Sequence, residues 1–232
     1  MKNLAVILAR SGSKGLKNKN IKLLDGKPLM AYSIESAKQS GIFDAIHVST
    51  DSEEYKRIAE EFGAEEPFLR DEELAQDNIT LRETVLGVLE QYEKIGKTFD
   101  NVMVLQPTSP LRDVKDVVKA YNLFIEKKAK AVISVCECDY PPVWCNTLTQ
   151  DGNMESFIKE ENIRPRQELP IYYRVNGAIY LYTTEYIKET DCIYTSSTYA
   201  YIMDKNRSVD IDDILDFKIA ELYLEENRKN NG

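Results

Sequence analysis

The chain of 232 residues carries 39 acidic against 30 basic side chains, which gives a net charge of -9, and this balance excludes general nucleic-acid binding because that function needs an extended basic surface. No apolar run approaches the roughly 18 residues that would predict a membrane span, and a single histidine excludes a histidine-cluster metal site. We expect a cytoplasmic protein, since Met1 to Asn3 lead directly into a predicted strand and the four cysteines show no metal or disulfide pattern.

The first predicted strand runs directly into a basic loop. Leu4 to Leu8 are five apolar residues, β-branched in the middle, which predicts a fully buried strand. The following loop, residues 9–20, contains no acid but two glycines and four cations, namely Gly12, Gly15, Arg10, Lys14, Lys17 and Lys19. Glycines let the backbone turn its N–H groups toward an anion, so the loop favours a polyphosphate site, although its spacing matches neither common nucleotide motif. The alternative is a solvated surface turn.

Alternating strands and helices follow. A helix is predicted over 28–39 and ends at Gly41, a strand over 45–50, and a helix that ends at Gly63. This order predicts a parallel sheet covered by helices. Asp51 stands between a strand and a helix, where we interpret it as the helix N-cap rather than a site residue. Residues 64–70 are strand-like, residues 71–75 form a helical turn, and a longer helix covers 80–94.

The third strong strand, residues 101–105, ends in a loop with two prolines and two hydroxyls, residues 106–112. Ligands of open α/β sheets bind at the carboxyl ends of the strands, so Gln106 and Arg112 are candidates for the site. The alternative is a rigid connection without a binding role. A helix over 114–128 and a fourth strand over 131–135 complete this part.

Residues 140–174 differ from the rest of the chain in composition and in the length of the predicted elements. Prolines punctuate short stretches without a long helix, and Asp151-Gly152 predicts the turn of a hairpin. Aromatic residues in such an excursion favour packing against a partner. Arg164, Arg166 and Arg174 are candidate clamps for a phosphate or carboxylate, unless they are merely scattered surface arginines.

The last part of the chain brings a pair of carboxylates. Strands are predicted over 179–182 and 199–203, and Asp210 and Asp212 stand two apart in an extended segment, on one side. Two such carboxylates suit Mg²⁺, which takes its other ligands from phosphates and water. Compensation of a helix dipole would explain Asp212 but not Asp210. A basic loop and a carboxylate pair together predict phosphoryl or nucleotidyl transfer.

The chain resembles the CMP-sialic acid synthetases (acylneuraminate cytidylyltransferases) over nearly its whole length. The residues that carry the resemblance are Leu8 to Gly15 with Lys19 and Asn20, Leu105 to Arg112, Tyr173 to Tyr180, and Ser208 to Asp212 with Asp216 and Phe217. It implies a single nucleotidyltransferase domain over 1–232, of the three-layer α/β/α, nucleotide-diphosphosugar transferase type, with a mostly parallel mixed sheet. It also implies a homodimer whose protruding lobe, residues 140–174, reaches toward the partner's site.

The resemblance further implies the reaction of CTP with a nine-carbon 2-keto sugar acid, N-acetylneuraminate or a relative, to give CMP-sugar and pyrophosphate. The catalytic residues would be Lys19, Arg10 and Asp210. The nucleotide would contact Arg10, Gly12, Ser13, Lys14, Gly15, Lys19, Asn20, Arg70 and Thr80. The sugar acid would contact Gln106, Arg166, Asn176 and Tyr180, and Asp210 and Asp212 would hold Mg²⁺ or Mn²⁺.

Two departures from the family pattern stand out. Leu81 replaces a hydroxyl residue expected near the base or ribose, and Lys17-Asn18 replaces a common Pro-Gly pair. Two alternatives stay open. The same fold could serve another pair of substrates, such as an octulosonate with CTP or a hexose-1-phosphate with UTP or GTP, or the protein could bind a nucleotide without catalysis.

Overall fold

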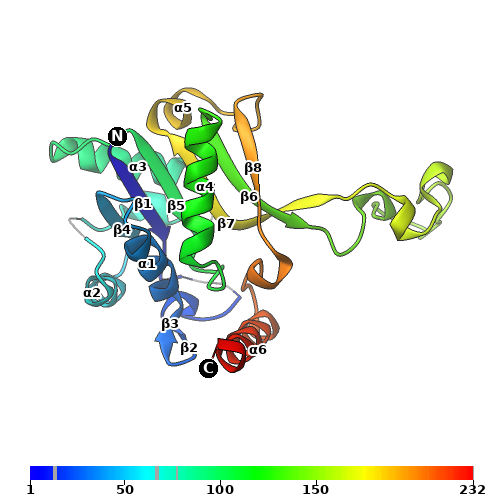
Figure 1. Ribbon diagram of the computed structural model, residues 1–232, viewed down its shortest axis with the longest axis horizontal. Coiled ribbons are helices and arrows are strands. Elements are labelled where there is room, and N and C mark those ends of the chain that lie inside the picture. Colours follow the sequence, from blue (N-terminus) through cyan, green and yellow to red (C-terminus); the bar gives the residue numbers. More distant parts are fainter. Residues whose placement is uncertain (13–14, 66–67, 77, 232) are drawn as a thin grey trace.

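The computed structural model of the protein describes residues 1–12, 15–65, 68–76 and 78–231. Its centre is a six-stranded sheet in the order β4-β1-β5-β7-β6-β8 (Figure 1). The strands are β1 Asn3–Leu8, β4 Ala45–Ser49, β5 Asn101–Leu105, β6 Ala131–Glu137, β7 Tyr173–Thr183 and β8 Thr198–Ile202. The strands β2 Leu23–Leu24 and β3 Lys27–Pro28 form a separate small pair.

The sheet is mixed and mostly parallel, as the sequence predicted. β1 pairs in parallel with β4 on one side and β5 on the other, and β8 is parallel to β6. Only β7 runs antiparallel, between β5 and β6. All five residues of β5 and five of the six of β1 are buried, because helices cover both faces of the sheet at its centre. The continuous apolar runs in the sequence reflect this two-sided burial.

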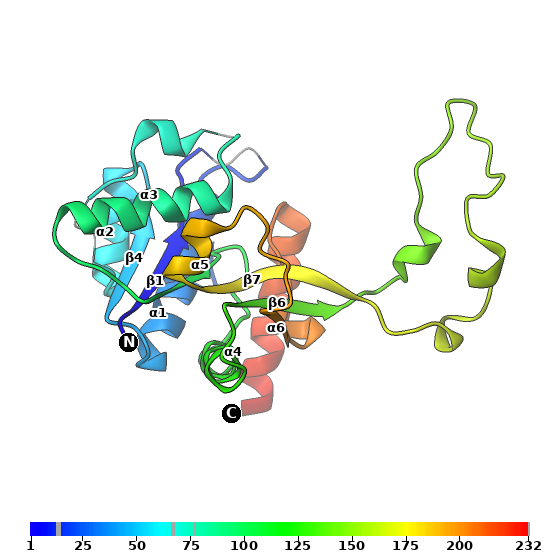
Figure 2. The ribbon, with the colours of Figure 1, turned by 90° about the horizontal axis from the view of Figure 1, so that it is seen from above.

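Helices form one layer on each face of the sheet (Figure 2). The helices α1 Leu29–Ser40, α2 Glu53–Phe62 and α4 Val114–Glu126 share one core with Ile7, Met103 and Leu181. The helices α3 Leu81–Lys94 and α5 Thr184–Glu189 share the other with Val6 and Val104. Val6 and Ile7, neighbours in β1, therefore pack into the cores on opposite faces of the sheet, because side chains alternate along a strand.

Local signals set the helix ends. Thr80 and Asp113 cap α3 and α4 with reciprocal capping boxes, and Gly41 and Gly63 end α1 and α2 in the left-handed conformation that glycine adopts readily. The predicted helices are thereby confirmed within a residue or two. Among the described residues, no helix is long and apolar enough to cross a membrane.

The last helix, α6 Ile214–Asn231, fixes the segment that precedes it. Phe217 and Ala220 of α6 pack with Leu24, Leu111 and Ile211 in a third apolar cluster. The Ile211 amide also donates to the Thr108 carbonyl at 2.8 Å. Residues 208–212, which we call the strap, are therefore held against the loop that follows β5.

Residues 138–172 leave the sheet between β6 and β7 and form a protruding lobe (Figures 1 and 2). The lobe contains three short 3-10 helices, Pro142–Trp144, Glu160–Asn162 and Arg166–Glu168. The chain turns at Asp151-Gly152 as predicted, with Gly152 at a φ of +72°, but the residues beside it form no strands. The predicted hairpin is therefore wrong beyond its turn, since an isolated two-stranded ribbon is only marginally stable without a sheet or helix to cover it.

Candidate active site

The basic loop and the strap meet at the carboxyl ends of the parallel strands. A cavity of about 450 Å³ is lined by Leu8, Arg10, Gly15, Lys19, Asn20, Thr108 and Asp212. These residues come from the end of β1, from the loop that follows it, from the loop after β5 and from the strap. Two cations, Arg10 and Lys19, and the Asp212 carboxylate, nearly two hundred residues away in the chain, thus face one space, as the prediction of nucleotidyl transfer requires.

Lys19 links the loop to the strap directly. It begins a 3-10 turn, Lys19–Ile21, and its Nζ donates to the Ile211 carbonyl at 2.5 Å and to Asp212 Oδ1 at 3.2 Å. The Lys19 side chain is only 13% exposed, whereas that of Asp212 is 82% exposed. The ammonium is therefore fixed in place, while the carboxylate remains open to a ligand.

Gly15 brings the loop against the strap at a second point. A Cβ atom at position 15 would lie 2.6 Å from the Asp212 carbonyl oxygen, so only glycine permits this approach. A Cβ at Gly12 would meet nothing within 4 Å. Ser13 and Lys14, which the sequence assigns to the nucleotide, lie outside the described residues.

Asp210 lies deeper than Asp212 and next to Gly177 of β7. Gly177 has a φ of +77°, and a Cβ there would lie 3.4 Å from Asp210 Oδ2 and 3.7 Å from Gln106 Oε1. The strand thus allows a carboxylate and an amide from two other segments to approach its backbone. Burial raises the pKa of Asp210, and the nearby charge of Asp212 raises it further, against a hydrogen bond from Thr108 and attraction by Lys19 and Arg174.

The two carboxylates fit a divalent cation. Their mutual repulsion, seen in the pKa of Asp210, is what a cation between them would relieve. No cluster of three or more acidic, histidine or cysteine side chains suited to a metal occurs in the described part of the chain. A cation at this pair would need further ligands from oxygens of a bound ligand or water, as Mg²⁺ has beside phosphates.

A second, smaller cavity adjoins the first. It has a volume of about 240 Å³ and shares Leu8 and Arg10 with the larger cavity, and it is further lined by Arg70, Leu74, Gln76, Ile79, Leu81, Thr84 and Gln106. Four of its nine lining side chains are aliphatic and the other five are polar or charged, a mixture that suits a flat heterocycle with hydrogen-bonding groups. Leu81, the departure from the family pattern, lies on this wall.

Arg70 is buried at the edge of this smaller cavity. Its Nε donates to Ser49 Oγ at 2.9 Å and its Nη2 donates to the Ser49 carbonyl at 2.6 Å. Burial lowers the pKa of Arg70 to about 10; Asp51 raises it and Arg10 lowers it. Two arginines therefore border one cavity at short range.

Thr80 has a clear local role. Its Oγ1 accepts from the Glu83 amide at 3.2 Å and donates to the Glu83 carboxylate at 2.7 Å, which caps α3. Its neighbour Leu81, not the Thr80 hydroxyl, provides the contact surface of the smaller cavity.

Two polar residues that the sequence offered for the site lie behind it. Asn176 is buried, its Oδ1 accepts from Ser134 Oγ at 2.6 Å and its Nδ2 donates to Ser208 Oγ at 2.9 Å. Arg112 is also buried and donates to the carbonyls of Gln106 and Ala178. The polar groups of both residues are therefore engaged in holding the loop and the strap, and a contact of Asn176 with the sugar acid stays a prediction.

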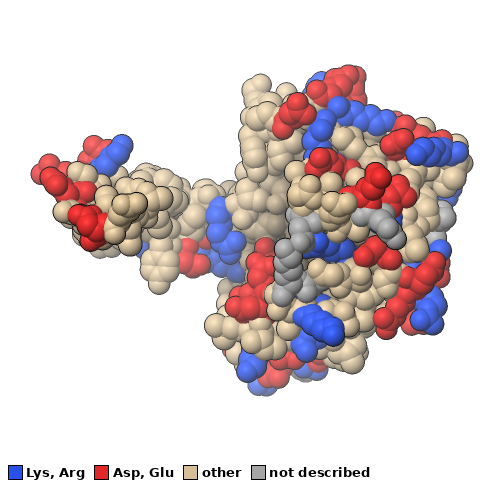
Figure 3. All heavy atoms as spheres, turned by 180° about the vertical axis from the view of Figure 1, so that it is seen from behind, with Lys and Arg blue, Asp and Glu red and all other residues tan. Residues whose placement is uncertain are grey.

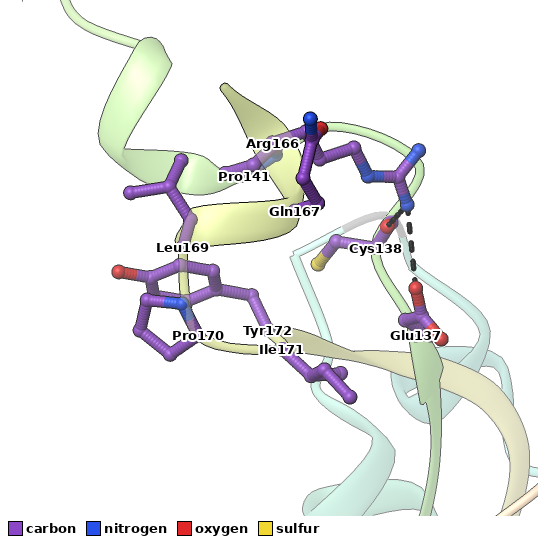
Figure 4. Close-up of a pocket in the computed structure, with 9 residues that line it drawn as sticks. All are labelled: Glu137, Cys138, Pro141, Arg166, Gln167, Leu169, Pro170, Ile171 and Tyr172. Atoms are coloured by element: carbon purple, nitrogen blue, oxygen red, sulfur yellow. Dashed lines mark hydrogen bonds and ion pairs between the residues drawn. The ribbon is translucent and has the colours of Figure 1, made fainter. Parts of the chain in front are cut away.

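Tyr180 and Arg166 lie in different places. Tyr180 of β7 is half-buried, and burial raises its pKa, as do the nearby Tyr194 and Asp210. Arg166 instead lies at the base of the lobe, where its Nη2 contacts Glu137 Oε1 at 3.3 Å and the Cys138 carbonyl at 3.2 Å (Figure 4). The cavity beside it, about 360 Å³, is lined by Glu137, Cys138, Pro141, Arg166, Gln167, Leu169, Pro170, Ile171 and Tyr172. Within one chain, Arg166 therefore does not border the cavity that holds Lys19.

Asp51 is not the helix cap that the sequence predicted. Ser52 caps α2, since its Oγ accepts from the Tyr55 amide at 3.4 Å. Asp51 instead accepts two hydrogen bonds from Ser11, in the basic loop. The strand-like residues 64–70 are not a strand in their described part either, although the Glu65 and Arg70 amides each donate to carbonyls in or just after β4.

Thr108 is a site residue that sequence reasoning missed. It borders the larger cavity and its side chain bonds to Asp210. The two hydroxyls after β5 were visible in the sequence, but nothing local distinguished the one that faces the strap.

Comparison with known proteins gives a consistent result. Residues 4–228 match the cytidylyltransferase family. The chain is 37% identical to the CMP-N,N'-diacetyllegionaminic acid synthase of Legionella pneumophila and 34% identical to the pseudaminic acid cytidylyltransferase of Campylobacter jejuni, in each case over 99% of both chains. It is 39% identical to the N-acylneuraminate cytidylyltransferase of Escherichia coli over 94% of its own length, but spans only 51% of that relative.

Solved structures share the fold. A CMP:2-keto-3-deoxy-manno-octonic acid synthetase complexed with CTP superposes with a TM-score of 0.72 at 16% identity, covering 98% of this chain and 100% of the other. A 4-diphosphocytidyl-2C-methyl-D-erythritol synthase from Anaerococcus prevotii gives a TM-score of 0.64 at 13% identity, covering 97% of this chain and 98% of the other. At such low identity the likeness establishes the three-layer architecture and nothing finer.

Proposed function

Because the chain belongs to the cytidylyltransferase family, we propose that it transfers the cytidylyl group of CTP to a nine-carbon 2-keto sugar acid and releases pyrophosphate. The observation that carries this proposal is the single cavity in which Arg10 and Lys19 face Asp212, with Asp210 beside it. Relatives that align over 99% of both chains are named for legionaminic and pseudaminic acids, which supports an acidic sugar as acceptor.

In this reaction the anomeric hydroxyl at C2 of the sugar attacks the α-phosphorus of CTP in line. The new bond joins the sugar oxygen to phosphorus, the hydroxyl proton is released to solvent, and the bond from phosphorus to the β-phosphate oxygen breaks, so that pyrophosphate leaves. Lys19 and Arg10 neutralise charge that develops on the α-phosphate and the leaving group. Lys19 suits this role because Ile211 and Asp212 already fix its ammonium, and a preorganised charge need not reorient during the reaction.

Asp210 and Asp212 would hold Mg²⁺ or Mn²⁺. When bound, such an ion would supply positive charge to the reacting phosphate. The protein's part is to keep the two carboxylates adjacent, which the Ile211–Thr108 hydrogen bond and the Thr108 contact to Asp210 accomplish.

The cytidine would occupy the smaller cavity, with Arg70 at its edge and Leu81 against its base or ribose. Arg10 borders both cavities, so it would lie between the nucleoside and the triphosphate. The sugar acid would lie on the other side of Asp210, where Gln106 and Tyr180 are close to that carboxylate.

We further propose a cytoplasmic homodimer in which Arg166 reaches the sugar-acid site of the other copy. Within its own chain Arg166 lies at the base of the lobe, so only a second copy could bring it to a sugar acid. The lobe exposes large apolar side chains, with Tyr140, Ile163 and Ile171 each more than 60% exposed, and much of its surface is uncharged (Figure 3). All four cysteines are free thiols, as expected in a reducing compartment.

The test is pyrophosphate release with CTP, UTP and GTP in combination with neuraminate, legionaminate, pseudaminate and an octulosonate. We expect turnover with CTP and at least one nine-carbon acid, and none without a divalent cation. Turnover with UTP and a hexose-1-phosphate but not with CTP would refute the proposal. Preference for the octulosonate would favour the alternative substrate pair on the same fold.

A further inference from the structure

We propose that Asp51 is a positioning residue for the nucleotide: it fixes the first turn of the basic loop and so aims Arg10 at the cavity. This inference rests on the proposed function, since it assigns a role within the same site. It starts from a residue at the carboxyl end of β4 that the α2 cap does not require, because Ser52 provides that cap.

Both carboxylate oxygens of Asp51 are engaged by one residue of the loop. Asp51 Oδ1 accepts from the Ser11 amide at 2.8 Å, and Asp51 Oδ2 accepts from Ser11 Oγ at 2.9 Å. Hydrogen bonds to an ionised acceptor are about twice as strong as neutral ones. Burial opposes ionisation of Asp51, but the bonds from Ser11 and the charge of Arg70 outweigh it and lower the pKa of Asp51. The acceptor therefore stays charged at neutral pH.

Three successive residues of the loop are tied down in this way. The Ala9 amide donates to the Ser49 carbonyl at 3.0 Å, and the Arg10 carbonyl accepts from Asn20 Nδ2 at 3.1 Å. The Ser11 amide bond to Asp51 is the third of these ties. The backbone is thus held in place on both sides of the Arg10 side chain.

These hydrogen bonds determine where the Arg10 side chain lies. That side chain borders both cavities, and its Nη1 contacts the Ala75 carbonyl at 3.4 Å. Arg10 and Arg70 repel each other at the smaller cavity, and the charge of Asp51 offsets that repulsion at Arg70. Without Asp51, the loop would lose its tie to the sheet at Ser11 and the two cations would separate.

The test compares steady-state kinetics of Asp51→Ala, Asp51→Asn and Ser11→Ala with those of the wild type. Ser52→Ala is the matched control, since it removes a cap from the neighbouring position and costs stability without touching the loop. We expect Asp51→Ala to raise KM for CTP by roughly 10- to 100-fold, the range seen when groups that orient a ligand-binding side chain are removed. KM for the sugar acid should change by less, because Arg10 borders the two cavities that the proposal assigns to the nucleotide.

Graded variants separate positioning from stability. Ser11→Ala removes only the hydroxyl bond and should fall between wild type and Asp51→Ala. Asp51→Asn keeps an acceptor for the Ser11 amide and should recover most of the loss. Equal effects of Asp51→Ala and Ser52→Ala on kcat/KM for CTP, or a kcat/KM for CTP that is unchanged in Asp51→Ala, would overturn the inference. A wild-type protein that releases no pyrophosphate from CTP would instead refute the proposed function.

Discussion

Replacing Lys19 by methionine tests the charge that the proposed site would place beside the triphosphate. Methionine keeps the length and most of the volume of the side chain, so the change removes the ammonium and little packing. The ammonium bond to the Ile211 carbonyl is worth about 1.5–3 kcal/mol for a charged donor, and the ion pair with the exposed Asp212 at most about 1 kcal/mol. Because the ammonium no longer has to be buried, we expect a net loss of about 1–2 kcal/mol of folding free energy.

For a chain of 232 residues this loss lowers Tm by about 5 °C, so the variant remains folded at assay temperature. Turnover should fall much further, by about 10²- to 10³-fold, which is the cost of removing one group that stabilises charge in a transition state. Pyrophosphate release under saturating CTP and sugar acid measures the second effect, and thermal melting measures the first.

Lys17→Met is the matched control. Lys17 stands in the same loop and is exposed, and its replacement changes the net charge by the same amount. We expect it to retain at least half of the wild-type turnover. The reasoning would be refuted if both variants lost activity equally, since overall charge and not position would then be responsible, or if Lys19→Met kept more than a tenth of the wild-type rate.

Three further predictions concern the strap and the core. Asp210→Asn should lower turnover by more than about 100-fold. It should leave Tm unchanged or slightly higher, because a carboxylate whose pKa is raised by burial is destabilising when ionised. A large fall in Tm would contradict this. Arg207→Leu should lower the free energy of unfolding, measured with urea, by about 3–5 kcal/mol, because the buried Asp116 would lose its partner. Asp116 is only 1% exposed and accepts from Arg207 at 2.9 and 3.1 Å. A loss below about 1 kcal/mol would contradict a buried ion pair. Burial lowers the pKa of His47 from 6.5 to about 4. As the pH falls, the unfolded chain therefore binds a proton at this imidazole before the folded protein does. The stability that His47 contributes is lost as the pH falls from 6.5 toward 4. Between pH 7 and pH 5 the wild type should lose about 2 kcal/mol more than His47→Leu, and parallel pH profiles would contradict this.

The sequence predicted best what local rules decide. β1 and β5 are continuous apolar runs, and they are buried on both faces. Helix ends follow from single residues, as at Gly41 and Thr80, because capping depends on groups within one turn.

The choices that failed depend on distant residues. Asp51 and Ser52 are equally good caps by type, and what separates them is Ser11, forty positions earlier in the chain. Arg112 looks like a ligand-binding arginine until its burial against Ala178 is known. The first residues of β7 are exposed, and pairing with a distant segment, such as that of Glu137 with Tyr173, makes them part of the strand.

The candidate site likewise has parts that local sequence predicts and parts that depend on distant residues. The sequence offered the cations of the loop and the carboxylates of the strap separately, and family resemblance joined them. Neither singled out Thr108, because its role arises from a contact with Asp210, across a loop and a strap that the Ile211–Thr108 hydrogen bond holds together.

A single strand connects three parts of this molecule. β7 leaves the lobe at Tyr173, passes the site at Gly177 and ends in the core at Thr183. From Tyr173 to Gly177 the extended backbone covers only about 13 Å. In the proposed dimer, a displacement of the lobe would therefore reach the wall beside Asp210 through four residues of covalent backbone, which would couple assembly to the acceptor site.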